Sequence, residues 1–153
     1  MMTRLTHPLA AAIALLGLTA GAASADIERL KATGSVAETI DRLEQAVEGA
    51  GATIFARVDH AEGAASVDME LADAELLIFG NPQLGTPAMQ ADPLAGLALP
   101  LRVLAYADAE GQTWIAYEEP EEMFDDLDID DDAPFVEKME DALEKLTKAA
   151  SGS

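Results

Sequence analysis

The chain has 153 residues, half of them hydrophobic, which is enough for one domain with a core and short for two. Its 29 acidic and nine basic residues give a formal charge of −20, and a surface of that sign repels nucleic-acid phosphates and anionic lipid heads. It has no cysteine, which excludes disulfides, thiolate metal sites and cysteine nucleophiles. We therefore expect a single acidic domain that does not bind nucleic acid.

Residues 1–25 have the pattern of a secretory signal peptide. A weakly basic start precedes an apolar run of small residues and leucines, and Ala-Ser-Ala at 23–25 has the small-x-small form that signal peptidase cleaves. A retained membrane anchor is the alternative, but two glycines interrupt the run, which is short for a bilayer span. We expect cleavage after Ala25 and export to the periplasm or the medium. The mature chain then has eight basic and 29 acidic residues, a charge of −21, and we expect no membrane span in it.

The first half of the mature chain alternates strand and helix patterns. A short strand is expected over 27–33. The segment Ser35-Val36-Ala37-Glu38 has the form of a capping box, and apolar residues then recur at spacings of three and four, so a helix of about 14 residues should follow. Strands are expected over 53–59 and 74–79, and the second is so continuously apolar that it should lie inside the sheet. The connection between them has room for one helical turn.

The next segment predicts two short helical turns and a hairpin. Thr86-Pro87 and Asp92-Pro93 each place a capping residue before a proline, the arrangement that starts helices. Residues 101–107 and 113–118 read as two strands joined by a turn, in which Gly111 suits a positive φ. Strands with helices before and after them predict an α+β fold with a largely antiparallel sheet packed by helices.

The carboxy-terminal part divides into an acidic linker, 125–133, and an amphipathic helix, 134–150. Phe135, Met139 and Leu143 are four residues apart along that helix, and Leu146 continues the apolar stripe. Such a stripe predicts that the helix packs on the sheet or on a second subunit.

Acidic residues in the linker have the spacing of a calcium loop. With Asp126 at position 1, Asp128, Asp130 and Glu137 fall at positions 3, 5 and 12 of an EF-hand. An aspartate occupies the glycine position and a proline falls at position 9, so a regular EF-hand is not expected. A weak divalent-cation site on a flexible acidic loop and a solvated linker remain the two interpretations.

Five segments occur in the order and spacing of a known bacterial family. They are SVAETIDRLEQAVEGAGATIFARVDH, LLIFGNP, TPAM, LALPLRVLAYAD and WIAYEEP. Residues 35–120 thereby resemble the DUF302 family, also described as the TT1751-like fold. The resemblance implies one α+β domain, over 26–124, that often associates in pairs, so we expect a homodimer. It implies no reaction, because the function of the family is unknown, and residues from 125 onward have no counterpart in it.

The abrupt Gly80-Asn81-Pro82 corner is the first candidate ligand site. Proline restricts Asn81 to an extended backbone and glycine permits a bend, so a structural turn accounts for the corner without a ligand. The alternative is that the Asn81 amide binds a small molecule, with His60 nearby if their two strands are neighbours.

Two basic side chains complete the set of candidates. His60 is the only histidine of the mature chain, and with no cysteine and no nucleophile elbow it cannot be assigned to a hydrolytic triad. Arg102 shares a strand face with Leu104 and Tyr106, where it should pair with a carboxylate or reach the rim of the sheet.

The sequence therefore predicts an exported, non-enzymatic binding or accessory module of the bacterial envelope, with an envelope protein or a small molecule as its partner. One alternative is a ligand carrier or enzyme that uses the Gly80-Asn81-Pro82 corner with His60. The other is weak calcium binding by residues 125–137. No other cofactor is expected.

Overall fold

The structure, a computed structural model, describes residues 27–152, so the predicted signal peptide lies outside the described residues. The strands are β1 (Ile27–Lys31), β2 (Thr53–Asp59), β3 (Ala74–Gly80), β4 (Leu101–Ala107) and β5 (Thr113–Glu118). The helices are α1 (Val36–Gly49), α2 (His60–Ala65), α3 (Pro82–Ala91), α4 (Ala95–Ala98), α5 (Pro120–Phe124) and α6 (Pro134–Ser151). No helix of this part of the chain is long and apolar enough to cross a membrane.

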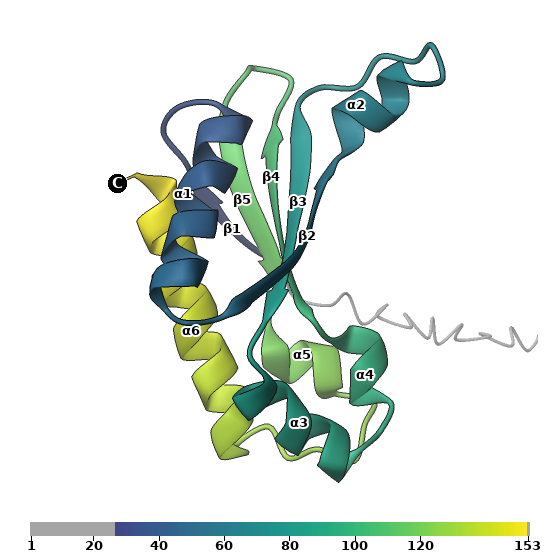
Figure 1. Cartoon of the computed structure of the whole chain (residues 1–153), viewed down its shortest axis with the longest axis vertical. Coiled ribbons are helices and arrows are strands. Elements are labelled where there is room, and N and C mark those ends of the chain that lie inside the picture. Colours follow the sequence, from purple (N-terminus) through teal and green to yellow (C-terminus); the bar gives the residue numbers. More distant parts are fainter. Residues whose placement is uncertain (1–26, 153) are drawn as a thin grey trace, which may run out of the picture.

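The five strands form one antiparallel sheet in the order β1-β5-β4-β3-β2. Helices α1 and α6 cover one face, while α3, α4 and α5 gather beyond the lower end of the sheet in Figure 1. The predicted α+β class, the antiparallel sheet and the inner position of β3 are confirmed. The 101–107 and 113–118 hairpin is also confirmed, and Gly111 in its turn has a φ of 80°.

The capping box predicted before α1 is present. The Glu38 backbone N–H donates to Ser35 Oγ at 3.2 Å, and the Ser35 backbone N–H donates to Glu38 Oε2 at 2.8 Å. Because hydrogen bonds to the ionised carboxylate favour the charged form, the backbone and hydroxyl of Ser35 lower the pKa of Glu38. The sequence thus fixes where α1 begins.

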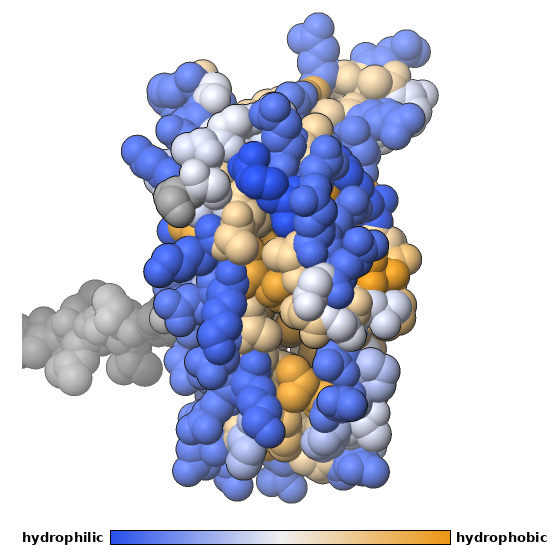
Figure 2. All heavy atoms as spheres, turned by 60° about the vertical axis from the view of Figure 1, so that its left-hand side comes forward, coloured by the Kyte–Doolittle hydropathy of each residue, from blue (hydrophilic) through white to orange (hydrophobic). Residues whose placement is uncertain are grey.

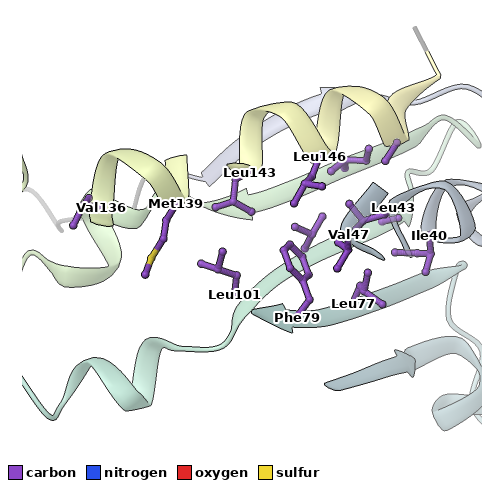
Figure 3. Close-up of a cluster of buried hydrophobic side chains, with 14 of the residues drawn as sticks. Ile40, Leu43, Val47, Leu77, Phe79, Leu101, Val136, Met139, Leu143 and Leu146 are labelled. Atoms are coloured by element: carbon purple, nitrogen blue, oxygen red, sulfur yellow. The ribbon is translucent and has the colours of Figure 1, made fainter. Parts of the chain in front are cut away.

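The core lies between the sheet and the two long helices (Figure 3). Leu77 and Phe79 of β3 meet Leu43 and Val47 of α1, all of them almost completely buried. The stripe predicted on α6 also faces this core: Met139, Leu143 and Leu146 are buried, and Phe135 packs against the core but is only partly buried. In the first turn Val136, which was not predicted, is the fully buried residue. The second face of the sheet lies away from α1 and α6, and Ile27 at its edge is 47% exposed.

One end of this core is closed by hydrogen bonds, and we call it the closed end. Arg42 Nε donates to Ala150 O at 2.8 Å, and Arg42 Nη2 donates to Thr33 O at 2.6 Å. The Thr33 backbone N–H donates to Ser151 O at 2.8 Å. These contacts join β1, α1 and the last turn of α6, so the chain after β1 and the carboxy-terminal turn are held together.

The opposite end of the core lies where β3 ends and β4 begins. The helices predicted from the sequence at this end were wrong in part. A single helix, α3, begins at Pro82, five residues before the predicted start at Pro87, and Pro87 lies inside it. Asn81 and Pro82 form the stronger start signal, since Asn81 caps the helix and proline occupies its first position. After Asp92-Pro93 the predicted second turn is present as α4. The short helix α5 was not predicted.

Candidate ligand cavity at the Gly-Asn-Pro corner

The Gly80-Asn81-Pro82 corner is a helix cap. Asn81 has extended backbone angles, φ −128° and ψ 119°, and its side-chain oxygen accepts from the Gln83 backbone N–H at 2.9 Å. The corner therefore turns the chain from β3 into α3, as the structural interpretation predicts.

The same corner is part of the wall of a cavity of about 340 Å³, which we call the corner cavity. Its floor is made of the buried side chains of Phe79, Leu101, Met139 and Leu146. Met139 on α6 and Leu101 on β4 point toward each other there (Figure 3). The volume lies in the range of small-molecule sites, which are concave and mostly apolar.

Exposed apolar residues surround the mouth of the corner cavity. Phe55 of β2 and Met89 of α3 both line the cavity and are 57% and 41% exposed. Leu97, beside the lining residue Gly96, is 82% exposed. Figure 2 shows apolar residues gathered in the middle of the face that carries α1 and α6, between hydrophilic ones, with the surface hollowed among them.

Met89 lies over two glycines at this mouth. A β-carbon at Gly96 would lie 3.5 Å from Met89 Sδ, and one at Gly85 would lie 3.9 Å from Met89 Cε. The absence of side chains at both positions leaves space beneath the methionine. Since methionine is unbranched and adapts to its surroundings, this wall of the cavity can change shape at low cost.

The lining has almost no polar character. Every lining residue is Ala, Gly, Phe, Leu, Met, Pro, Asn or Thr, so none is titratable. Asn81 and Thr86 supply the only polar side chains among these lining residues. Within residues 27–152 neither the Asn81 amide nitrogen nor the Thr86 hydroxyl makes a hydrogen bond with the protein. The site can bind an apolar molecule, and it offers hydrogen bonds from two side chains.

His60 does not lie near Asn81, so the predicted pairing of these two residues was wrong. Their strands are neighbours, as the hypothesis required, but β2 and β3 are antiparallel. Asp59, before His60, pairs with Glu75, whereas Gly80, before Asn81, pairs with Thr53 at the other end. At about 3.4 Å per residue the two side chains are separated by roughly 20 Å along the sheet. His60 is exposed at the start of α2.

Arg102 lies on the open face of the sheet and does not line the corner cavity. Arg102 Nη2 lies 3.6 Å from Glu118 Oε2 on the neighbouring strand, so the predicted ion pair is present. The Arg102 side chain is 47% exposed, and a pair so open to water contributes little to stability.

The four carboxylates of the predicted calcium loop are not gathered around one point. In the described part of the chain no three His, Asp or Glu side chains are arranged to hold a metal ion. Glu137 lies in the first turn of α6, and the Asp128 backbone N–H instead donates to Asp92 Oδ2 at 3.2 Å. Calcium binding by Asp126, Asp128, Asp130 and Glu137 therefore stays a prediction without a preformed site.

The corner could be predicted from the sequence, but the cavity could not. The floor and walls come from residues far apart in the chain, and Leu99, Met139 and Leu146 line one cavity because α3 packs against both α4 and α6. The apolar stripe of α6 was the available signal, and by itself it indicates only packing. Three glycines in the lining, at 80, 85 and 96, give no periodic pattern.

The fold and the cavity define a small α+β domain with an apolar site at one end of its sheet. The family model described as "Domain of unknown function DUF302" matches residues 28–151. This span is most of the chain, and the chain belongs to the DUF302 family, with the TT1751-like fold. The match also includes residues 125–151, so the expectation that this part has no counterpart in the family was wrong.

A solved structure gives the same fold. The chain is similar to the crystal structure of an uncharacterized conserved DUF302 protein from Bacillus stearothermophilus, with a TM-score of 0.66 and 20% sequence identity. The likeness covers 82% of this chain and 95% of that one. At this identity it bears on the fold alone.

The chain is also similar to part of three curated proteins. Fluoride-specific ion channel FluC 1 of Brucella suis and its namesake in Brucella abortus are 45% identical over 86 residues, as is FluC 2 of Brucella melitensis. Those residues are 56% of this chain and 34%, 32% and 32% of the three relatives. The chain thus matches about a third of the length of these channels.

Proposed function

We propose that the protein is an exported, non-enzymatic binding module of the bacterial envelope that holds a small apolar molecule in the corner cavity. The observation that carries this proposal is the cavity itself, about 340 Å³ with a buried apolar floor and an exposed apolar mouth. Its lining has no acid, base or other titratable group, which supports binding rather than catalysis. The signal-peptide pattern of residues 1–25 supports export to the periplasm or the medium.

The mature protein is proposed to be a homodimer. The open face of the sheet supports pairing, because it carries half-buried apolar residues such as Leu76, Ile78 and Leu104 and lies away from α1 and α6. Two such faces together would remove apolar surface from water.

Native mass spectrometry tests the proposal on residues 26–153 purified from the periplasm. The matched variants are Ala142→Leu, which extends a side chain into the cavity wall, and Ala149→Leu, an equal change at an exposed position of α6. We expect a bound mass on the wild type and on Ala149→Leu that is absent from Ala142→Leu. The same bound mass on all three proteins, or on none, would contradict the cavity as the functional site.

The same spectra test two further expectations. A dimer mass at micromolar protein supports the homodimer, and a monomer contradicts it. Loss of a bound mass on addition of a chelator would assign that mass to a cation, and would favour weak calcium binding by residues 125–137 over the cavity.

A second candidate function is an accessory role beside a fluoride channel. The similarity favours it, since about a third of each of three proteins named as fluoride-specific ion channels matches this chain. Here the protein would act through contact with the channel, because the corner cavity has no charged group for fluoride. Loss of the gene should then lower the fluoride concentration that stops growth. Unchanged fluoride tolerance would contradict this role.

A further inference from the structure

The charge, the polar groups and the size of the corner cavity restrict the class of molecule that it can hold. This inference rests on the proposed function and makes it more specific. Each of the three properties comes from a different set of residues, so each can be tested separately.

Charge excludes ionic ligands. No residue that lines the cavity is charged, so a carboxylate, phosphate or ammonium group inside would have no partner. Burying an unpaired ion is among the most costly changes in a protein interior. The formal charge of −20 on the whole chain adds repulsion against anions outside the mouth. The occupant is therefore neutral.

Hydrogen bonding adds a second restriction. The Asn81 side-chain oxygen accepts from the Gln83 backbone N–H, which holds the side chain in place, and its amide N–H₂ group can only donate. In the part of the chain that the structure describes, this amide nitrogen has no hydrogen-bond partner. Thr86, also in the lining, is exposed and adds a hydroxyl near the mouth. A ligand with one acceptor oxygen can satisfy the free donor of Asn81.

Size sets the third restriction. The volume of about 340 Å³ lies at the lower end of the range of small-molecule sites, roughly 300–1,000 Å³, which favours a small occupant. We propose that the corner cavity binds a small neutral apolar molecule that carries one hydrogen-bond acceptor, such as a ketone, and that the acceptor oxygen binds the Asn81 amide.

Four probes of similar size test this proposal. Acetophenone is neutral with an acceptor, ethylbenzene lacks only the carbonyl oxygen, benzoate is an anion and benzylammonium is a cation. Binding is followed at pH 7 by the methyl resonances of ¹³C-methionine-labelled protein. Met89 and Met139 line the cavity, whereas Met69 lies on the exposed loop after α2 and serves as internal control.

We expect acetophenone to shift the methyl resonances of Met89 and Met139 in a saturable way and to leave that of Met69 unchanged. Benzoate and benzylammonium should bind at least tenfold more weakly. Asn81→Asp keeps the cap and loses the donor, so it should weaken acetophenone about tenfold and ethylbenzene less than twofold. Because the aspartate also adds a negative charge, the double comparison measures the lost hydrogen bond together with repulsion of the carbonyl oxygen, and separates both from the apolar contacts.

The outcomes separate two kinds of failure. If no probe shifts Met89 or Met139, the cavity does not bind small molecules and the proposed function fails with this inference. If benzoate or benzylammonium binds as tightly as acetophenone, or Asn81→Asp weakens acetophenone and ethylbenzene equally, the site binds but the assigned class is wrong. Shifts of Met89 and Met139 with protein concentration alone would show that a second copy fills the cavity, which also overturns the inference.

Discussion

The two ends of the core beneath α1 and α6 are built by opposite means. At the closed end, Arg42 joins the carbonyl oxygens of Thr33 and Ala150, and the fully buried Ala150 fits against neighbouring side chains. At the corner end, the walls are glycines and flexible apolar side chains around about 340 Å³ of space. The hydrogen-bonded end holds the fold together, and the corner end contains space that the fold does not need.

This contrast explains why one small domain can combine stability with a binding site. Close packing and satisfied polar groups specify a unique structure, while a site for a ligand requires space and therefore gives up packing contacts. Because the corner cavity lies at one end of the sheet, the close packing at the closed end is not interrupted.

The largest expected effect comes from placing the same extra volume at each end. Ala150→Leu overpacks the closed end and should lower the free energy of unfolding by about 3 kcal/mol. Ala142→Leu, two turns earlier on α6, enters the corner cavity and should change it by less than about 0.5 kcal/mol. Urea denaturation followed by the fluorescence of Trp114, the only tryptophan, gives both values. Equal losses would mean that the two ends are equally packed.

Removal of the Arg42 hydrogen bonds at the closed end should have the next largest effect on the free energy of unfolding. Arg42→Met keeps an apolar stem but loses charge-assisted hydrogen bonds to Thr33 and Ala150, and should cost about 2 kcal/mol. Arg29→Met, on the open face of the sheet, is the charge-matched control and should stay within about 0.5 kcal/mol. A cost for Arg42→Met no larger than that of the control would show that the closed end does not depend on this side chain.

At the corner end the cap of α3 should have a smaller effect. Asn81→Ala removes the acceptor for the Gln83 backbone N–H and should lower the free energy of unfolding by about 1 kcal/mol. Asn81→Asp retains an acceptor and adds negative charge at a helix amino terminus, so its stability should remain near that of the wild type. If thermal unfolding shows Asp to be as damaging as Ala, Asn81 does not act through the cap.

The smallest expected effect concerns Glu140, on the opposite side of α6. Its Oε1 is buried with no hydrogen-bond partner within residues 27–152. Burial, with the carboxylates of Glu121, Glu137 and Asp141, raises the pKa of Glu140 above its ordinary value of 4.5. A raised native pKa means that the native state binds the proton more tightly, so stability falls as the pH rises through that value.

Glu140→Gln removes the carboxyl that ionises and should stabilise the protein at pH 7 by at most about 1 kcal/mol. This gain in stability should vanish below pH 4, where the carboxyl of the wild type is protonated. Glu144→Gln, at an exposed position of the same helix, is the control. Melting temperatures of both variants at pH 7 and pH 4 provide the measurement. A gain that grows toward pH 4 would have the wrong sign for a raised pKa.

Local patterns were sufficient to predict most of the secondary structure. The capping box before Val36, the 101–107 and 113–118 strands and Gly111 each depend on neighbours in sequence, and each lies where it was predicted. The start of α3 was missed because Thr86-Pro87 and Asp92-Pro93 have the same cap-then-proline pattern as Asn81-Pro82. Sequence spacing alone does not show which of the three pairs starts the helix.

The candidate site could be predicted only in part, for a physical reason. Asn81 was singled out by its restricted backbone, a local property. His60 was paired with it wrongly because strand direction in a sheet is set by tertiary structure, and antiparallel pairing separates the ends of β2 and β3. The cavity floor, with Met139 and Leu146 facing Phe79, depends on contacts across more than 50 residues of chain, for which the sequence carries no local signal.

The free energy of unfolding of the wild type and Ala142→Leu, each with and without acetophenone, shows whether a small neutral molecule binds in the corner cavity. A ligand that binds only the native state stabilises it in proportion to the logarithm of its concentration above the Kd. We predict that the two proteins are equally stable alone and that only the wild type gains stability with acetophenone. An equal gain in Ala142→Leu would contradict binding in the corner cavity, because the molecule would then bind somewhere else on the protein.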